Sequence, residues 1–189
     1  MIGVLIKVAT ALREAEIPYA IGGSFASGAW SSPRITLDID IAVRMRQGDA
    51  ERLAKILGDD FYIESDGALA AILSRDEYRM FQGMYIPEVT KIDFFVVGDD
   101  EYSRSELERA VPVQVAEGME VRHTAPENII IQKLRWYELG NRVSDRQWND
   151  IVKVIEVQRG RLDWEYMRRW AQHFGLVELL EEADAEALD

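Results

Sequence analysis

Two stretches near the N-terminus decide the fold: Tyr19-Ala20-Ile21-Gly22-Gly23-Ser24 and, after a gap of 13 residues, Asp38-Ile39-Asp40-Ile41. The first stretch predicts a short strand that runs into a turn of small residues, where backbone N–H groups at a helix start can approach a phosphate. In the second stretch acidic and apolar residues alternate, so a β-strand would project Asp38 and Asp40 from one face with Cα atoms about 6.5 Å apart. The apolar neighbours are expected to bury the opposite face: Leu37, Ile39 and Ile41.

A third acid, Asp93, lies in the apolar stretch Lys91-Ile92-Asp93-Phe94-Phe95-Val96-Val97. A charge in an apolar strand is costly unless another group pairs with it. We therefore expect Asp93 to lie on a strand beside Asp38 and Asp40 and to complete a set of three carboxylates. Such hard oxygen ligands suit a pair of Mg²⁺ ions, which in two-metal sites lie about 3.5–4 Å apart.

The rest of the chain predicts an α/β (α+β) fold with a mixed sheet. Hydrophobic spacing predicts helices over 1–16, 50–57 and 103–110, and strands over 61–63, 78–86, 91–97, 111–115 and 120–122. The ambiguous segment 66–73 is taken as helical. Pro126 opens a helical region with helices over 126–137, 145–158 and 163–173, the last two capped by Ser144 and Asp163. The predicted organisation is a core of residues 1–124 and a C-terminal helical module of residues 125–189 that packs on the core.

Composition excludes several kinds of chemistry. The chain has 189 residues, 34 acids against 22 bases, a formal net charge of −12, two histidines and no cysteine. Disulfides, thiolate zinc sites and a cysteine nucleophile are therefore excluded, and a protein that coats nucleic acid by bulk electrostatics is disfavoured. No apolar run reaches the roughly 18 residues of a membrane helix, and the N-terminus lacks the features of a signal peptide. We expect a cytoplasmic protein, not bound to a membrane, that acts through carboxylates, hydroxyls and backbone.

The ordered pattern of Gly-Gly-Ser, Asp-x-Asp and a later strand Asp resembles the nucleotidyltransferase superfamily of the DNA polymerase β type, over residues 19–97. The run Arg34-Ile35-Thr36-Leu37-Asp38-Ile39-Asp40 is similar to those of small nucleotidyltransferases, including abortive-infection toxins of toxin–antitoxin pairs and some antibiotic-modifying enzymes. Segments 126–134 and 144–151 resemble the C-terminal helices of small toxin-like and uncharacterised nucleotidyltransferases. The resemblance implies a nucleotidyltransferase core.

The resemblance also implies roles for individual residues. Gly22, Gly23 and Ser24 would bind the nucleotide, and Asp38 and Asp40 would bind Mg²⁺. Asp93 would bind the catalytic ion and help to activate the acceptor hydroxyl. Because phosphoryl-type transfer depends on positioning and charge neutralisation, it needs neither cysteine nor histidine.

The implied activity is Mg²⁺-dependent transfer of NMP from an NTP such as ATP to an acceptor hydroxyl, with release of pyrophosphate. RNA or a protein would be the acceptor if the chain is the toxin of a toxin–antitoxin pair, and an antitoxin would then be its partner. One alternative is an antibiotic acceptor of the aminoglycoside or lincosamide type, which an acidic protein would suit. The other is a catalytically silent module that binds a nucleotide or a partner protein.

Some interpretations stay open at the level of sequence. Arg34 would either contact a phosphate or neutralise the nearby carboxylates. Lys133 is a candidate nucleotide ligand or the ion-pair partner of Asp150. Residues 133–169 hold nine bases and six acids, which suits either an RNA-binding face or ordinary solvated helices. The last twelve residues contain six acids and are expected to form a frayed tail.

Overall fold

The computed structural model describes residues 1–32, 36–76 and 78–188. The chain divides into two compact units. The first unit comprises Met1–Gly22 and Ile35–His123, and the second comprises Gly23–Arg34 and Thr124–Asp189. The predicted division into a core of 1–124 and a module of 125–189 stays a prediction.

The first unit is built on a mixed β-sheet, which confirms the predicted α/β class. Among the described residues, seven strands pair in the order β3-β4-β5-β2-β1-β7-β6. Two of the pairs, β2 with β5 and β1 with β7, are parallel, and the others are antiparallel. The strands are β1 (Tyr19–Ile21), β2 (Asp38–Val43), β3 (Phe61–Ile63), β4 (Met80–Tyr85), β5 (Thr90–Val96), β6 (Val111–Ala116) and β7 (Met119–His123).

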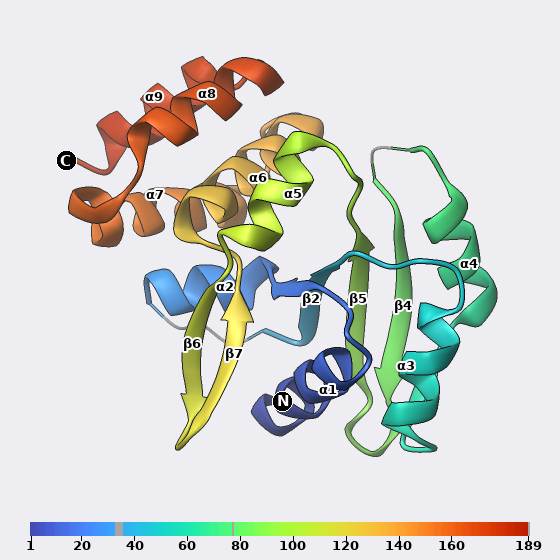
Figure 1. Ribbon diagram of the computed structural model, residues 1–189. Coiled ribbons are helices and arrows are strands. Elements are labelled where there is room, and N and C mark those ends of the chain that lie inside the picture. Colours follow the sequence, from blue (N-terminus) through green and yellow to red (C-terminus); the bar gives the residue numbers. More distant parts are fainter. Residues whose placement is uncertain (33–35, 77, 189) are drawn as a thin grey trace. The chain divides into compact units, whose positions relative to one another are not determined.

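The two faces of this sheet differ because side chains alternate along each strand. One face carries the apolar core, in which the rings of Phe81 and Phe94 stack at 4.9 Å. This face is covered by α1 (Ile2–Glu14), α3 (Asp49–Leu57) and α4 (Ser65–Leu73) (Figure 1). On the opposite face, α5 (Glu101–Glu108) packs Leu107 against Ala20 and Ala42. The carboxylates predicted to act together lie on this second face.

The alternation in β2 agrees with the prediction for two of the three flanking residues. Ile39 and Ile41 are fully buried on the apolar face. Leu37 is 81% exposed, so the expectation that it joins the core is wrong. The reason is that β2 begins at Asp38, so Leu37 has no place on the pleated face of the sheet.

The second unit is helical. It contains α2 (Gly23–Trp30), α6 (Pro126–Leu139), α7 (Asp145–Gln158), α8 (Trp164–Phe174) and α9 (Val177–Glu186). The predicted caps are present, since Ser144 accepts a hydrogen bond from the backbone N–H of Gln147 and Asp163 accepts one from that of Tyr166. Chain segments far apart in sequence meet here: the indole of Trp30 on α2 donates to the carbonyl of Thr124 at 2.7 Å.

The acidic C-terminus is a helix, which corrects the prediction of a frayed tail. Leu179, Leu180 and Ala183 of α9 are at most 3% exposed, and α9 packs on α7 and α8. Acids of this helix also have partners, because Asp184 binds Arg159 at 2.6 Å and Glu186 accepts from the indole of Trp148 at 2.7 Å. Acidity in this segment therefore marks the solvent side of an amphipathic helix. None of the helices in the described ranges has the length and apolarity to span a bilayer.

Candidate functional site

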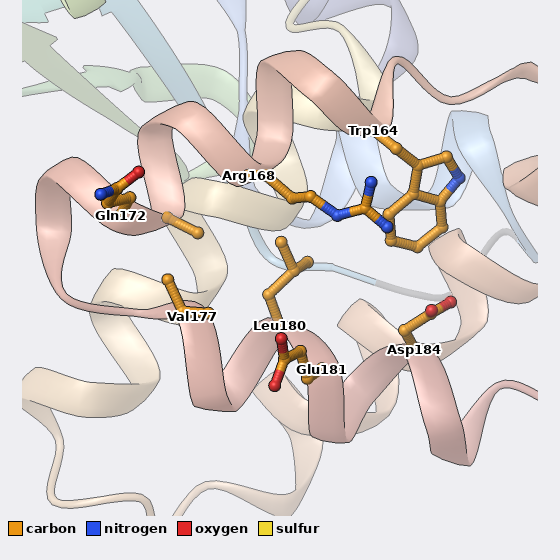
Figure 2. Close-up of a pocket in the computed structure, with 8 residues that line it drawn as sticks. Trp164, Arg168, Gln172, Val177, Leu180, Glu181 and Asp184 are labelled. Atoms are coloured by element: carbon orange, nitrogen blue, oxygen red, sulfur yellow. The ribbon is translucent and has the colours of Figure 1, made fainter.

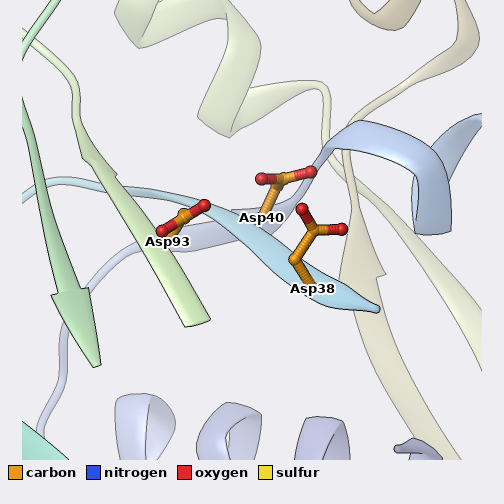
Figure 3. A group of neighbouring side chains, drawn as sticks. All are labelled: Asp38, Asp40 and Asp93. Carbon is orange, nitrogen blue, oxygen red and sulfur yellow. The ribbon is translucent and has the colours of Figure 1, made fainter. Parts of the chain in front are cut away.

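The strand register brings three of the predicted site residues together in the first unit. In the parallel pair of β2 and β5, Asp40 lies directly opposite Asp93, and Asp38 lies opposite Lys91. One carboxylate oxygen from each of Asp38, Asp40 and Asp93 lies within 4.8 Å of the others. Figure 3 shows the three side chains grouped on β2 and β5. We call these three residues the carboxylate triad.

Asp93 is the most buried member of the triad, with 6% of its surface exposed. Both of its carboxylate oxygens have protein partners: Lys91 Nζ donates to Oδ2 at 2.8 Å, and Gln82 Nε2 donates to Oδ1 at 3.3 Å. Gln82 comes from β4, where the antiparallel register places it opposite Asp93. The buried charge is therefore hydrogen-bonded on both sides, which offsets part of the cost of its burial.

Lys91 sits in a strongly acidic environment. Its hydrogen bond to Asp93 raises the pKa of the ammonium group by more than burial lowers it, and the charges on Asp93, Asp38 and Asp40 raise this pKa further. Its side chain is 45% exposed, so solvent screens part of these interactions. Lys91 is thus a firmly protonated cation at the edge of the triad.

The other two members of the triad are partly exposed. Thr36 Oγ1 donates to Asp38 Oδ1 at 2.8 Å, which orients that carboxylate at the start of β2. The N–H of Gly22 donates to the carbonyl of Asp40 at 2.8 Å, so the first glycine of the Gly-Gly-Ser turn extends the pairing of β1 with β2. An added Cβ at Gly22 would lie 3.8 Å from that carbonyl, an ordinary contact. The space around Gly22 therefore does not require a glycine.

The donor set fits a divalent cation of the Mg²⁺ type. Such ions prefer carboxylate oxygens at about 2.0–2.1 Å, so two oxygens on one ion lie at most about 4.2 Å apart. The three oxygens lie within 4.8 Å of one another, close to this span, and Asp38 and Asp40 are partly exposed. Among the described residues, the triad is the group of acidic or histidine side chains whose ligand atoms lie close enough together to hold a metal ion.

The remaining predicted nucleotide ligands belong to other parts of the chain. Gly23 and Ser24 are the first two residues of α2 in the second unit. Gly23 has φ of +54°, a left-handed conformation that favours glycine. Arg34 lies outside the described residues. The nucleotide-binding roles of Gly22, Gly23, Ser24 and Arg34 stay predictions.

Lys133 forms an ion pair with Asp150, which is one of the two roles that the sequence left open for it. Its Nζ lies 3.0 Å from Asp150 Oδ2 and 2.9 Å from Gln147 Oε1, both on α7. Only 6% of the Lys133 side chain and 12% of the Asp150 side chain are exposed. Asp150 is therefore a buried ion-pair partner of Lys133, and the nucleotide-binding role of Lys133 stays a prediction.

A separate hollow of about 370 Å³ lies between α8 and α9 of the second unit. Figure 2 shows Trp164 and Arg168 on one wall and Leu180, Glu181 and Asp184 on the other. The Arg168 guanidinium lies 5.9 Å from the centroid of the Trp164 ring. This hollow combines one aromatic face with charges of both signs and holds none of the predicted site residues.

Sequence reasoning missed two residues that contact the triad. Lys91 lies two residues before Asp93 on a strand, which places both side chains on one face. That signal was available. Gln82 had no comparable signal, because its contact depends on the pairing of β4 with β5, which periodicity alone does not give.

Solved structures with a similar fold exist, although no family model and no curated protein matches the chain. ANT(2'')-Ia in complex with adenylyl-2''-tobramycin is 18% identical with a TM-score of 0.58, over 92% of this chain and 95% of that chain. An antigenic nucleotidyltransferase-like protein from Paracoccidioides brasiliensis is also 18% identical, with a TM-score of 0.58 and coverage of 98% and 91%. JHP933 from Helicobacter pylori is 14% identical, with a TM-score of 0.52 and coverage of 98% and 86%. The chain therefore has the nucleotidyltransferase fold.

Proposed function

We propose that the chain is a Mg²⁺-dependent nucleotidyltransferase that transfers NMP from an NTP to an acceptor hydroxyl and releases pyrophosphate. The observation that carries this proposal is the carboxylate triad, Asp38, Asp40 and Asp93, on the same face of β2 and β5. The nucleotidyltransferase fold supports it. Because one fold can also serve inactive binding proteins, we infer activity from the chemistry of the triad and not from the fold alone.

In this proposal Asp38 and Asp40 hold a divalent ion, and Asp93 completes the ligand set; two ions are expected. Bound Mg²⁺ would supply positive charge that offsets the charges of the triad and of the triphosphate. The acceptor oxygen attacks the α-phosphorus, the bond from that phosphorus to the bridging oxygen breaks, and pyrophosphate leaves. Asp93, oriented by its hydrogen bond from Gln82, takes the proton of the hydroxyl. Gly22, Gly23, Ser24 and Arg34 are proposed to bind the nucleotide.

The leading acceptor is an RNA or protein hydroxyl, as in the toxin of a toxin–antitoxin pair, with an antitoxin as partner and the cytoplasm as location. The excess of bases over residues 133–169 supports an RNA acceptor. A cationic antibiotic is the second candidate. It is supported by the net charge of −12, which attracts cations, and by the similarity to ANT(2'')-Ia in complex with adenylyl-2''-tobramycin.

The test is nucleotide transfer by the purified chain. Each of four α-³²P-labelled NTPs is incubated with Mg²⁺ and, in separate reactions, with total RNA, cell protein or a panel of aminoglycosides and lincosamides. The compared variants are Asp38→Asn with Asp40→Asn, Asp93→Asn, and the control Asp59→Asn, an exposed acid away from the triad. Label is expected on one acceptor class with the wild type and the control and, at least a hundredfold less, with the triad variants.

Two results would refute the proposal in different ways. If the wild type binds NTP but no acceptor receives label, the chain is a silent nucleotide-binding module. If label transfer persists in Asp93→Asn, the role assigned to Asp93 is wrong. Label on RNA or protein favours the toxin hypothesis, and label on a drug favours the antibiotic acceptor.

A further inference from the structure

Lys91 contacts the triad but has no chemical role in the proposed mechanism. It lies on β5 opposite Asp38 and two residues before Asp93, so its side chain shares the face of the triad. Its Nζ lies 2.8 Å from Asp93 Oδ2, a charge-assisted hydrogen bond. The ammonium group thus holds an oxygen that the proposed metal site needs.

Without a metal ion, the negative charges of the triad destabilise one another. Three carboxylates whose oxygens approach within 4.8 Å repel one another, and Asp93 is also buried. Gln82 donates a hydrogen bond to Asp93 but carries no charge. Lys91 contributes both a hydrogen bond and a positive charge, so it reduces the repulsion in a way that Gln82 does not.

The ion pair between Lys91 and Asp93 can also be broken at little cost to the lysine. Its side chain is 45% exposed, whereas that of Asp93 is 9% exposed. A long, flexible and partly exposed side chain can move from the carboxylate into water, so no buried charge would be left on the lysine. A divalent ion that takes Asp93 Oδ2 would then replace the ammonium group rather than add to it.

We propose that Lys91 is a positioning residue that acts as an internal counter-cation: it holds the triad together before a divalent ion binds and competes with that ion for Asp93. This inference rests on the proposed metal site. It has two consequences that differ in sign. Removing the charge of Lys91 lowers the stability of the metal-free protein, and it raises the affinity for a divalent ion, by about tenfold for one unit charge close to the ion.

The experiment uses Mn²⁺ without nucleotide, so it does not depend on catalysis. Free Mn²⁺ is measured by electron paramagnetic resonance during titration of the full chain, and thermal unfolding is followed in chelator and in saturating Mn²⁺. The variants are Lys91→Met, which keeps the length of the side chain, and Lys91→Arg, which keeps its charge. Lys55→Met on α3 is the control, because it makes the same change in net charge on an exposed helix position.

Lys91→Met is expected to unfold at a lower temperature than the wild type in chelator, to bind Mn²⁺ about tenfold more tightly, and to gain more stability from Mn²⁺. Lys91→Arg and Lys55→Met are expected to stay within about twofold of the wild-type affinity. Equal or weaker Mn²⁺ binding by Lys91→Met, with binding by the wild type intact, overturns the inference on Lys91 alone. Failure of the wild type to bind Mn²⁺ more tightly than Asp38→Asn with Asp40→Asn overturns the proposed metal site and this inference with it.

Discussion

The ion pair between Lys133 and Asp150 gives the sharpest test of packing in the second unit. In the variant Lys133→Met, Asp150 keeps a charge that is 12% exposed and loses an ammonium group at 3.0 Å. Breaking one side of a buried pair costs about 3–5 kcal/mol, and the residual exposure of Asp150 places this case near about 3 kcal/mol. Gln147 also loses a hydrogen bond of 2.9 Å to the same Nζ.

The assay is urea unfolding of the full chain, followed by tryptophan fluorescence. With a slope of about 2–3 kcal/mol per molar urea, a loss of about 3 kcal/mol lowers the midpoint by about 1–1.5 M. Asp150→Asn should cost a similar amount, because it leaves Lys133 buried. The double variant removes both charges and should recover at least about 1 kcal/mol relative to the sum of the single losses. A loss below about 1 kcal/mol for Lys133→Met, or strict additivity in the double variant, would refute the argument that this lysine is a structural cation.

Three further predictions concern stability. Leu180→Ala on α9 should lower the free energy of unfolding in urea by about 2–4 kcal/mol, whereas Leu188→Ala, at a site 68% exposed, should lower it by less than about 0.5 kcal/mol. Equal losses would instead support the prediction of a frayed tail. Gly23→Ala, at φ of +54°, should cost about 1–2 kcal/mol in the same assay, more than Gly22→Ala, and the reverse order would contradict the left-handed conformation. Burial lowers the pKa of His123, so its contribution to stability is present above the unfolded pKa of about 6.5 and is lost as the pH falls through the lower folded pKa. His123→Leu should therefore show a shallower loss of unfolding free energy below pH 6.5, and an unchanged slope would rule out this contribution.

The sequence predicted the triad because its signals are local. The alternation around Asp38 and Asp40 sets their common face, and the apolar neighbours of Asp93 mark it as a strand residue that needs partners. What the alternation does not contain is which strands are neighbours. That β5 pairs with β2, and β4 with β5, depends on the topology of the whole sheet, so the contact of Gln82 with Asp93 was out of reach.

The wrong prediction of a frayed C-terminal tail has a different origin. Six acids in twelve residues are typical of a solvated tail, and that count outweighed the spacing of the apolar residues. Leu179, Leu180 and Ala183 recur three to four positions apart, which is the period of one helix face. Tertiary packing against α7 and α8 turns this weak local signal into a helix, as the burial of the three residues shows.

The spacing of the triad is set by residues that do not touch it. Asp40 faces Asp93 because Ile41 faces Phe94 one position along the same strands, with both side chains fully buried on the other side of the sheet. A slip of one residue between β2 and β5 would move these apolar side chains out of the core, so the register is strongly specified. A preformed set of carboxylates therefore follows from core packing, at the cost of mutual repulsion that a cation has to offset. Lys91 offsets it from within the chain, which is why its removal should change metal affinity and metal-free stability in opposite directions.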